Sequence, residues 1–115
     1  MSLGEDPGGP PLELRRTEDP AGLSINGEID LSNVDVLADA VRDHVPSSGL
    51  FTLDLSGCAY IGSEGIAVVI EAWKRLRDDG RLVLVAPEGT VRRVLELSGL
   101  ERFPNLELIH APSRT

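Results

Sequence analysis

The chain has 115 residues, of which 41% are hydrophobic and only 3% aromatic, and it carries a formal net charge of -8 at pH 7. A single domain of this length buries roughly two thirds of its unfolded surface, so it holds one core, built mainly from Leu, Val, Ile and Ala. The negative charge repels phosphate backbones, and no basic residues interleave with aromatic ones, so we expect neither nucleic acid nor an anionic membrane as a partner.

The cysteine and histidine content limits the chemistry further. Cys58 is the only cysteine, so no intramolecular disulfide forms, and with the two separated histidines, His44 and His110, it makes no zinc set. We expect a packed cysteine and solvated or partly packed histidines. The longest apolar run, at 66–70, is far below the ~20 residues that span a bilayer, and no cleavage pattern opens the chain. These features favour a cytoplasmic protein that has no metal site.

The first eleven residues contain three Pro and three Gly and offer nothing to bury. We therefore predict a disordered leader at 1–11, one folded domain at 12–110 and a short tail at 111–115.

The folded part opens with two alternating apolar stretches, one through Leu12 and Leu14 and one through Leu23 and Ile25. The Asp19-Pro20 turn between them predicts a β-hairpin. Ser32 stands three residues before Asp35, a variant capping box that predicts the start of a helix. Apolar residues then recur at helical spacing until Pro46 stops the helix.

Strands and helices alternate from there to the end of the domain. We predict a strand at 50–55 that ends at Ser56-Gly57, a helix at 63–79 that ends at Gly80, a strand at 82–85, a helix at 90–98 and a strand at 106–109. The order β-β-α-β-α-β-α-β predicts an α/β fold whose sheet is mostly parallel, with one antiparallel edge hairpin. In such sheets the working surface lies where strands pass into helices, here at 27–32 and 56–65.

Ser63 is the first candidate for function at these junctions. A serine at a helix start lies beside free backbone N–H groups, and the helix dipole favours negative charge there, so a phosphate on Ser63 would be held. The alternative interpretation is that Ser63 only caps the helix, which is worth about 1 kcal/mol.

Gly65 would lie in the first turn of the same helix, where glycine costs about 1 kcal/mol relative to alanine. Either another backbone, from a neighbouring loop or from a partner, approaches closely at this point, or the helix begins later. Further along, Val68 and Ala72 are left over from a complete core stripe and share a face with Glu64 and Arg75. An apolar strip in a polar rim is typical of a docking surface.

We find no set of residues for catalysis. The sequence has no phosphate-binding Gly-rich loop with a lysine, no nucleophile elbow and no pair of histidines at metal spacing. We therefore expect a binding protein without a cofactor of its own, and a small nucleotide-binding or hydrolytic enzyme is disfavoured.

Five separate stretches resemble the STAS domains of anti-sigma factor antagonists, in order and at matching spacing from about residue 12 to 110. They are Ile25-Asn26-Gly27-Glu28-Ile29-Asp30, Leu53-Asp54-Leu55-Ser56-Gly57 with Tyr60-Ile61, Ser63-Glu64-Gly65-Ile66, Arg81-Leu82-Val83-Leu84-Val85, and the stretch from Val91 to Leu100. The resemblance implies a bacterial partner-switching protein. Such antagonists bind an anti-sigma factor that is also a serine kinase, and phosphorylation ends binding until a metal-dependent phosphatase removes the phosphate.

The resemblance places the phosphoacceptor at Ser63 and the loop around Asp30 beside it. ATP and Mg²⁺ would belong to the partner kinase. We expect the partner to contact residues near this serine, namely Glu28, Asp30, Ser32, Gly62, Glu64, Gly65, Ile66 and Val68.

Two residues depart from the family pattern: Gly62 stands where an Asp is usual, and Glu64 where a second Ser or Thr is usual. The change to Gly62 removes one carboxylate, and Glu64 places a fixed negative charge next to Ser63. Both features favour an alternative in which the domain is a STAS scaffold or regulatory subunit of a transporter or stress-sensing complex, without a phosphorylation cycle.

Overall fold

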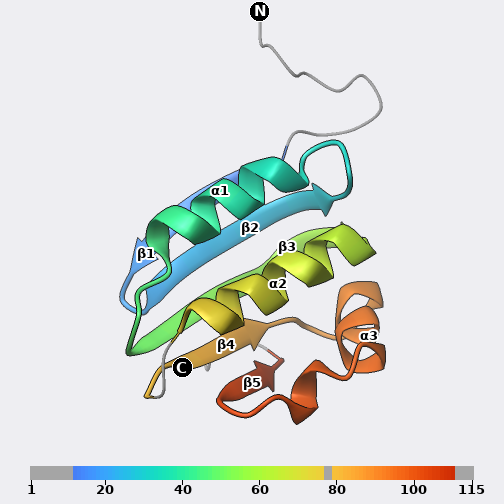
Figure 1. The fold of residues 1–115 in the computed structure, drawn as a ribbon. Helices are drawn as coiled ribbons and strands as arrows, with labels where there is room; N and C mark the ends of the chain where they lie inside the picture. The colour runs from blue at the N-terminus through green and yellow to red at the C-terminus, as the bar shows by residue number, and fades with distance from the viewer. Residues whose placement is uncertain (1–11, 77–78, 111–115) are drawn as a thin grey trace, which may run out of the picture.

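The sheet at the centre of this computed structural model has five strands in the order β1-β2-β3-β4-β5 (Figure 1). The structure describes residues 12–76 and 79–110, and the predicted leader at 1–11 and tail at 111–115 lie outside them. β1 pairs with β2 antiparallel, and the other pairs are parallel, which confirms the predicted α/β fold with its antiparallel edge hairpin. The strands are β1 (Glu13–Glu18), β2 (Ala21–Ile29), β3 (Leu50–Ile61), β4 (Arg81–Val85) and β5 (Leu106–Ile109).

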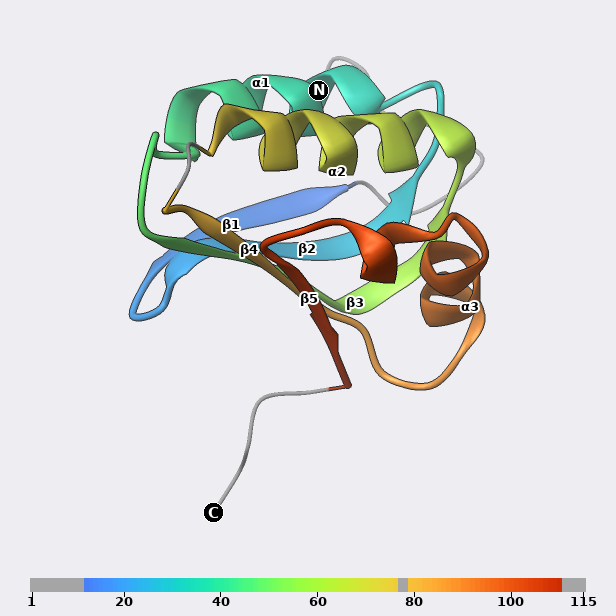
Figure 2. The ribbon, with the colours of Figure 1, turned by 60° about the horizontal axis from the view of Figure 1, so that its bottom comes forward.

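Two of the three α-helices lie side by side over the same face of the sheet. They are α1 (Val34–His44) and α2 (Ser63–Arg75), which Figure 2 shows above the strands. α3 (Thr90–Leu97) lies apart from this pair, past the carboxyl end of β4, and a short 3-10 helix, η1 (Leu100–Arg102), follows it (Figure 1). Every connection between parallel strands therefore contains a helix, as a parallel crossover generally requires.

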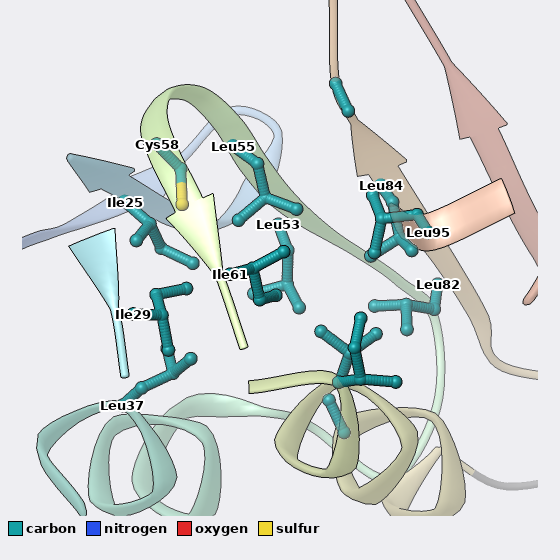
Figure 3. Close-up of a cluster of buried hydrophobic side chains, with 14 of the residues drawn as sticks. Ile25, Ile29, Leu37, Leu53, Leu55, Cys58, Ile61, Leu82, Leu84 and Leu95 are labelled. Carbon is teal, nitrogen blue, oxygen red and sulfur yellow. The ribbon is translucent and has the colours of Figure 1, made fainter. Parts of the chain in front are cut away.

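The core forms where alternate residues of the strands meet the helices. The apolar residues of β3 and β4 that face the helix layer are fully buried, and Leu37 of α1 points toward Ile29 of β2 (Figure 3). Cys58 lies among these side chains, and burial raises the pKa of its thiol. Its predicted role as a small packed side chain is confirmed.

β3 does not end at Ser56-Gly57, as the sequence predicts, but continues to Ile61. The register between β2 and β3 shifts at this point, and Ser56 N–H donates to Asp54 Oδ1 over 2.9 Å, so the turn-forming dipeptide makes an irregularity within the strand. A Cβ on Gly57 would collide with the Asn26 side chain of the neighbouring strand. Pairing with the long β2 strand therefore carries β3 past its local stop signal.

The predicted capping box at Ser32 and Asp35 is wrong. α1 begins at Val34, its N-cap is Asn33, and no side chain caps it. The Ser32 hydroxyl instead donates to Asp30 Oδ1 over 2.6 Å, because the loop bends back on itself before the helix starts.

α2 ends earlier than predicted. The predicted helix covers 63–79, but its last residue is Arg75, and Leu76 already has extended backbone angles. The chain leaves the helix here because β4 must begin with Arg81 paired to Leu50 of β3. Gly80 therefore belongs to the return to the sheet and does not stop the helix.

Gly65 lies buried in the first turn of α2, where the helix approaches the sheet most closely. A Cβ on Gly65 would meet Ile61 Cγ1 at 2.6 Å and Ile29 Cγ2 at 2.8 Å. The helix does begin at Ser63, so the alternative of a later start is wrong. The expected approach of another backbone is also wrong, because the close neighbours are core side chains of this chain. The absence of a side chain at Gly65 thus allows α2 to pack over β2 and β3.

We expect Gly65→Ala to lower the free energy of unfolding by about 1–3 kcal/mol, because overpacking outweighs the better helix propensity of alanine. Chemical denaturation measures this change. Ile61→Val removes the Cδ1 atom that lies 3.1 Å from the added Cβ, so the double variant should lose less stability than the sum of the two single variants. A Gly65→Ala protein as stable as the parent would contradict this account.

Candidate functional site

Ser63 lies where the carboxyl ends of β2 and β3 meet. Ile29 and Ile61 are partners at the last step of this strand pair, and Gly62 N–H then donates to the Ile29 carbonyl over 3.0 Å. This hydrogen bond fixes the first residues of α2 next to Asp30 and the loop that leads into α1. The structure therefore brings together the two strand-to-helix junctions that the sequence predicts to be functional.

The Ser63 side chain is exposed and is not the helix cap. The N-cap of α2 is Gly62, no side chain caps the helix, and Ser63 is its first helical residue. Within the described part of the chain, Ser63 Oγ takes part in no hydrogen bond. The interpretation of Ser63 as a simple cap is therefore wrong, and its hydroxyl is open to a partner.

The loop beside Ser63 is held by its own hydrogen bonds. Asp30 Oδ1 accepts from Ser32 N–H at 3.0 Å and from Ser32 Oγ at 2.6 Å, and Asn33 Nδ2 donates to the Glu28 carbonyl at 2.8 Å. Asp30 N–H in turn donates to Asn33 Oδ1 at 3.0 Å. The loop therefore offers a preformed surface to a partner, which lowers the entropy cost of binding.

Several carboxylates lie around this junction. Glu28 at the end of β2, Asp30 in the loop, Asp35 in the first turn of α1 and Glu64 in the first turn of α2 form no ion pair with any described residue. Their charges make the surface around Ser63 acidic.

Exposed apolar side chains lie on the same segments. Leu31 is 74% exposed in the loop, Val36 is 53% exposed in the first turn of α1, and Tyr60 is 46% exposed near the end of β3. We call these three residues the apolar patch. Large exposed apolar side chains rimmed by polar residues mark protein interaction sites. The sequence motifs do not predict the patch, although Val36 falls outside the apolar stripe of its helix, which is a signal for an exposed apolar side chain.

The strip predicted on Val68 and Ala72 is not an exposed apolar face. Ala72 is fully buried, on the same stripe of α2 as the buried Gly65 and Val69, and Val68 is half-buried against the core. α1 also packs alongside α2, where Arg75 Nη2 donates to the Arg42 carbonyl over 3.4 Å. Helical spacing alone does not determine which side of α2 meets the core.

The predicted partner-contact residues divide into two groups by burial. Gly62, Gly65 and Ile66 are buried, and Gly65 and Ile66 face the core, so these residues support the junction from its buried side. Glu28 and Ser32 are exposed, and Asp30 and Glu64 are partly exposed around Ser63. The exposed group and the apolar patch form the surface that a partner can reach.

The described residues show no other arrangement for ligand chemistry near this surface. Between 12 and 110, leaving out 77–78, no three His, Cys, Asp or Glu side chains gather where they could hold a metal ion. No described helix has the length and apolar character needed to span a lipid bilayer.

Comparisons with known proteins agree on one family. Residues 12–109 match a family model described as "Mlab, STAS domain". The anti-sigma-F factor antagonist RsfB of Mycobacterium tuberculosis is 30% identical over 83 residues, which are 71% of this chain and 68% of RsfB, with the same values in two strains.

Solved structures give the same result. An anti-sigma factor antagonist from Mycobacterium paratuberculosis superposes with a TM-score of 0.73 at 26% identity, over 86% of this chain and 84% of that one. The anti-sigma factor antagonist SpoIIAA in its unphosphorylated form shares the fold, with a TM-score of 0.58 at 17% identity over 89% and 90% of the two chains. The family resemblance read from the motifs is confirmed, and this chain belongs to the STAS domain family.

Proposed function

We propose that this protein is an anti-sigma factor antagonist that binds an anti-sigma factor through the surface around Ser63. The observation that carries the proposal is the exposed, unbonded Ser63 hydroxyl at the start of α2, bordered by carboxylates and by the apolar patch. The names of the relatives that match over most of the chain support it. The partner is a cytoplasmic serine kinase as well as an anti-sigma factor, and it supplies ATP and Mg²⁺, so this chain needs no cofactor.

Phosphorylation of Ser63 would end binding without unfolding the domain. A phosphate adds about -1.5 to -2 charges at pH 7 to a surface that is already acidic. Burying this charge against the partner costs desolvation energy. The neighbouring groups are carboxylates that form no ion pair with any described residue, so they do not offset the added charge. A metal-dependent phosphatase would restore the binding form.

The second candidate is a STAS scaffold or regulatory subunit that contacts its partner without a phosphorylation cycle. It is favoured by the Glu64 carboxylate, which places a permanent charge next to Ser63 whatever the activity of a kinase. Both candidates use the same surface, so the identity of the partner separates them.

Affinity purification of the full chain from its own cells, followed by mass spectrometry, should recover a protein with a GHKL-type kinase domain. Recovery that depends on the apolar patch and Ser63 would support partner switching. Recovery of a transporter ATPase instead would overturn the switching proposal in favour of the scaffold.

Incubation with the co-purified kinase and Mg²⁺-ATP should add one phosphate, and peptide mapping should place it on Ser63. Ser63→Ala is expected to abolish the modification, since its hydroxyl is the one exposed at the start of α2. An active kinase that leaves Ser63 unmodified would show that this serine is not the acceptor.

Leu31→Ala should weaken binding of the anti-sigma factor about tenfold, because truncating an apolar anchor at the centre of an interface costs more than 1 kcal/mol. Calorimetry or surface plasmon resonance measures the dissociation constant. Leu97→Ala is the matched control, since Leu97 is 80% exposed on α3, a helix that carries none of the predicted contact residues. Equal losses in the two variants, or none in either, would count against the apolar patch as the docking surface.

A further inference from the structure

The space beside Gly62, which has no side chain, is occupied by the end of the Glu64 side chain. The Gly62 φ of -87° and ψ of 178° are angles that any residue adopts. A Cβ at this position, however, would lie 2.5 Å from Glu64 Oε1, 3.5 Å from the Tyr60 hydroxyl and 3.6 Å from Tyr60 Cε2. The Glu64 carboxylate is therefore folded back over Gly62, beside the tyrosine ring, and Glu64 remains partly exposed.

This position puts the Glu64 carboxylate at the uncapped start of α2. The first N–H groups of a helix have no intrahelical acceptor, and the positive end of the helix dipole stabilises an anion close to them. No side chain at the N-cap occupies this place, because the N-cap is Gly62. Glu64 thus supplies the negative charge at the helix start that a phosphate on Ser63 would otherwise supply.

The titratable side chains on the segments that meet at this junction are acidic or neutral. They are Glu28 in β2, Asp30 in the β2–α1 loop, Asp35 in α1, Tyr60 in β3 and Glu64 in α2, and no described Lys, Arg or His forms an ion pair with any of them. A phosphate on Ser63 would therefore join carboxylates that have no ion-pair partner among the described residues.

We propose that Glu64 is a specificity-determining residue that opposes the doubly charged form of phosphorylated Ser63, and that Gly62 provides the space that lets its carboxylate do so. This inference rests on the proposed phosphorylation of Ser63. The phosphate competes with Glu64 for the start of α2 and must displace it or retain a proton. Glu64 therefore limits how much negative charge phosphorylation adds. The change in charge at the docking surface is smaller than it would be without Glu64.

The test uses the full chain with phosphoserine placed at position 63 during synthesis, so that no kinase is involved. A ³¹P NMR titration between about pH 4.5 and 8 follows the second ionisation of the phosphate, whose ordinary pKa is about 6. We expect Glu64→Gln to lower this phosphate pKa by about half a unit or more, because a like charge several ångströms away has been removed.

Two further variants test whether the phosphate pKa depends on the position of the Glu64 carboxylate or only on the total charge of the protein. Gly62→Ala keeps the Glu64 charge but pushes the flexible carboxylate off its place, so it should lower the phosphate pKa by a smaller amount in the same direction. Glu18→Gln removes one exposed charge at the far end of the β1–β2 hairpin and should leave the phosphate pKa unchanged.

A phosphate pKa that is the same in the parent and Glu64→Gln would overturn the inference, as would equal shifts in Glu64→Gln and Glu18→Gln. Thermal unfolding gives a second readout: phosphorylation should lower the melting temperature more in the parent than in Glu64→Gln. Because the phosphate is installed without an enzyme, failure of this inference is distinct from failure of the proposed function, which the kinase assay decides.

Discussion

The hydrogen bond from Gly62 N–H to the Ile29 carbonyl, 3.0 Å long, is the contact on which the site depends. It exists because β2 and β3 both continue to their last residues, Ile29 and Ile61, as a parallel pair. A β3 strand that ended at the Ser56-Gly57 turn signal would leave the start of α2 without this anchor. The extra strand pairing thus decides where Ser63 lies relative to the Asp30 loop.

The same junction has a buried side, which packs against the core, and an exposed side, which a partner can reach. On the buried side, Gly65 lets Ile29 and Ile61 pack directly beneath the helix. On the exposed side, Ser63 and Leu31 face outward. Because the buried side fixes the backbone, a partner meets a surface that needs little rearrangement.

Electrostatics gives this surface its character. The chain is strongly acidic as a whole, and the carboxylates at the junction form no ion pairs among the described residues. A partner with basic residues around an apolar contact would complement it. The two departures from the family motif, Gly62 and Glu64, prove to be linked, because the side chain of one fills the space left by the other.

The order of the elements, the mostly parallel sheet and the start of a helix at Ser63 follow from the sequence alone. Apolar periodicity and turn residues are local signals, and they suffice for such features. The continuation of β3 through Ser56-Gly57, the burial of Ala72 and the exposure of Leu31 arise only from tertiary packing. These outcomes depend on which distant segments pack together, and the spacing of residues along the chain does not specify that packing.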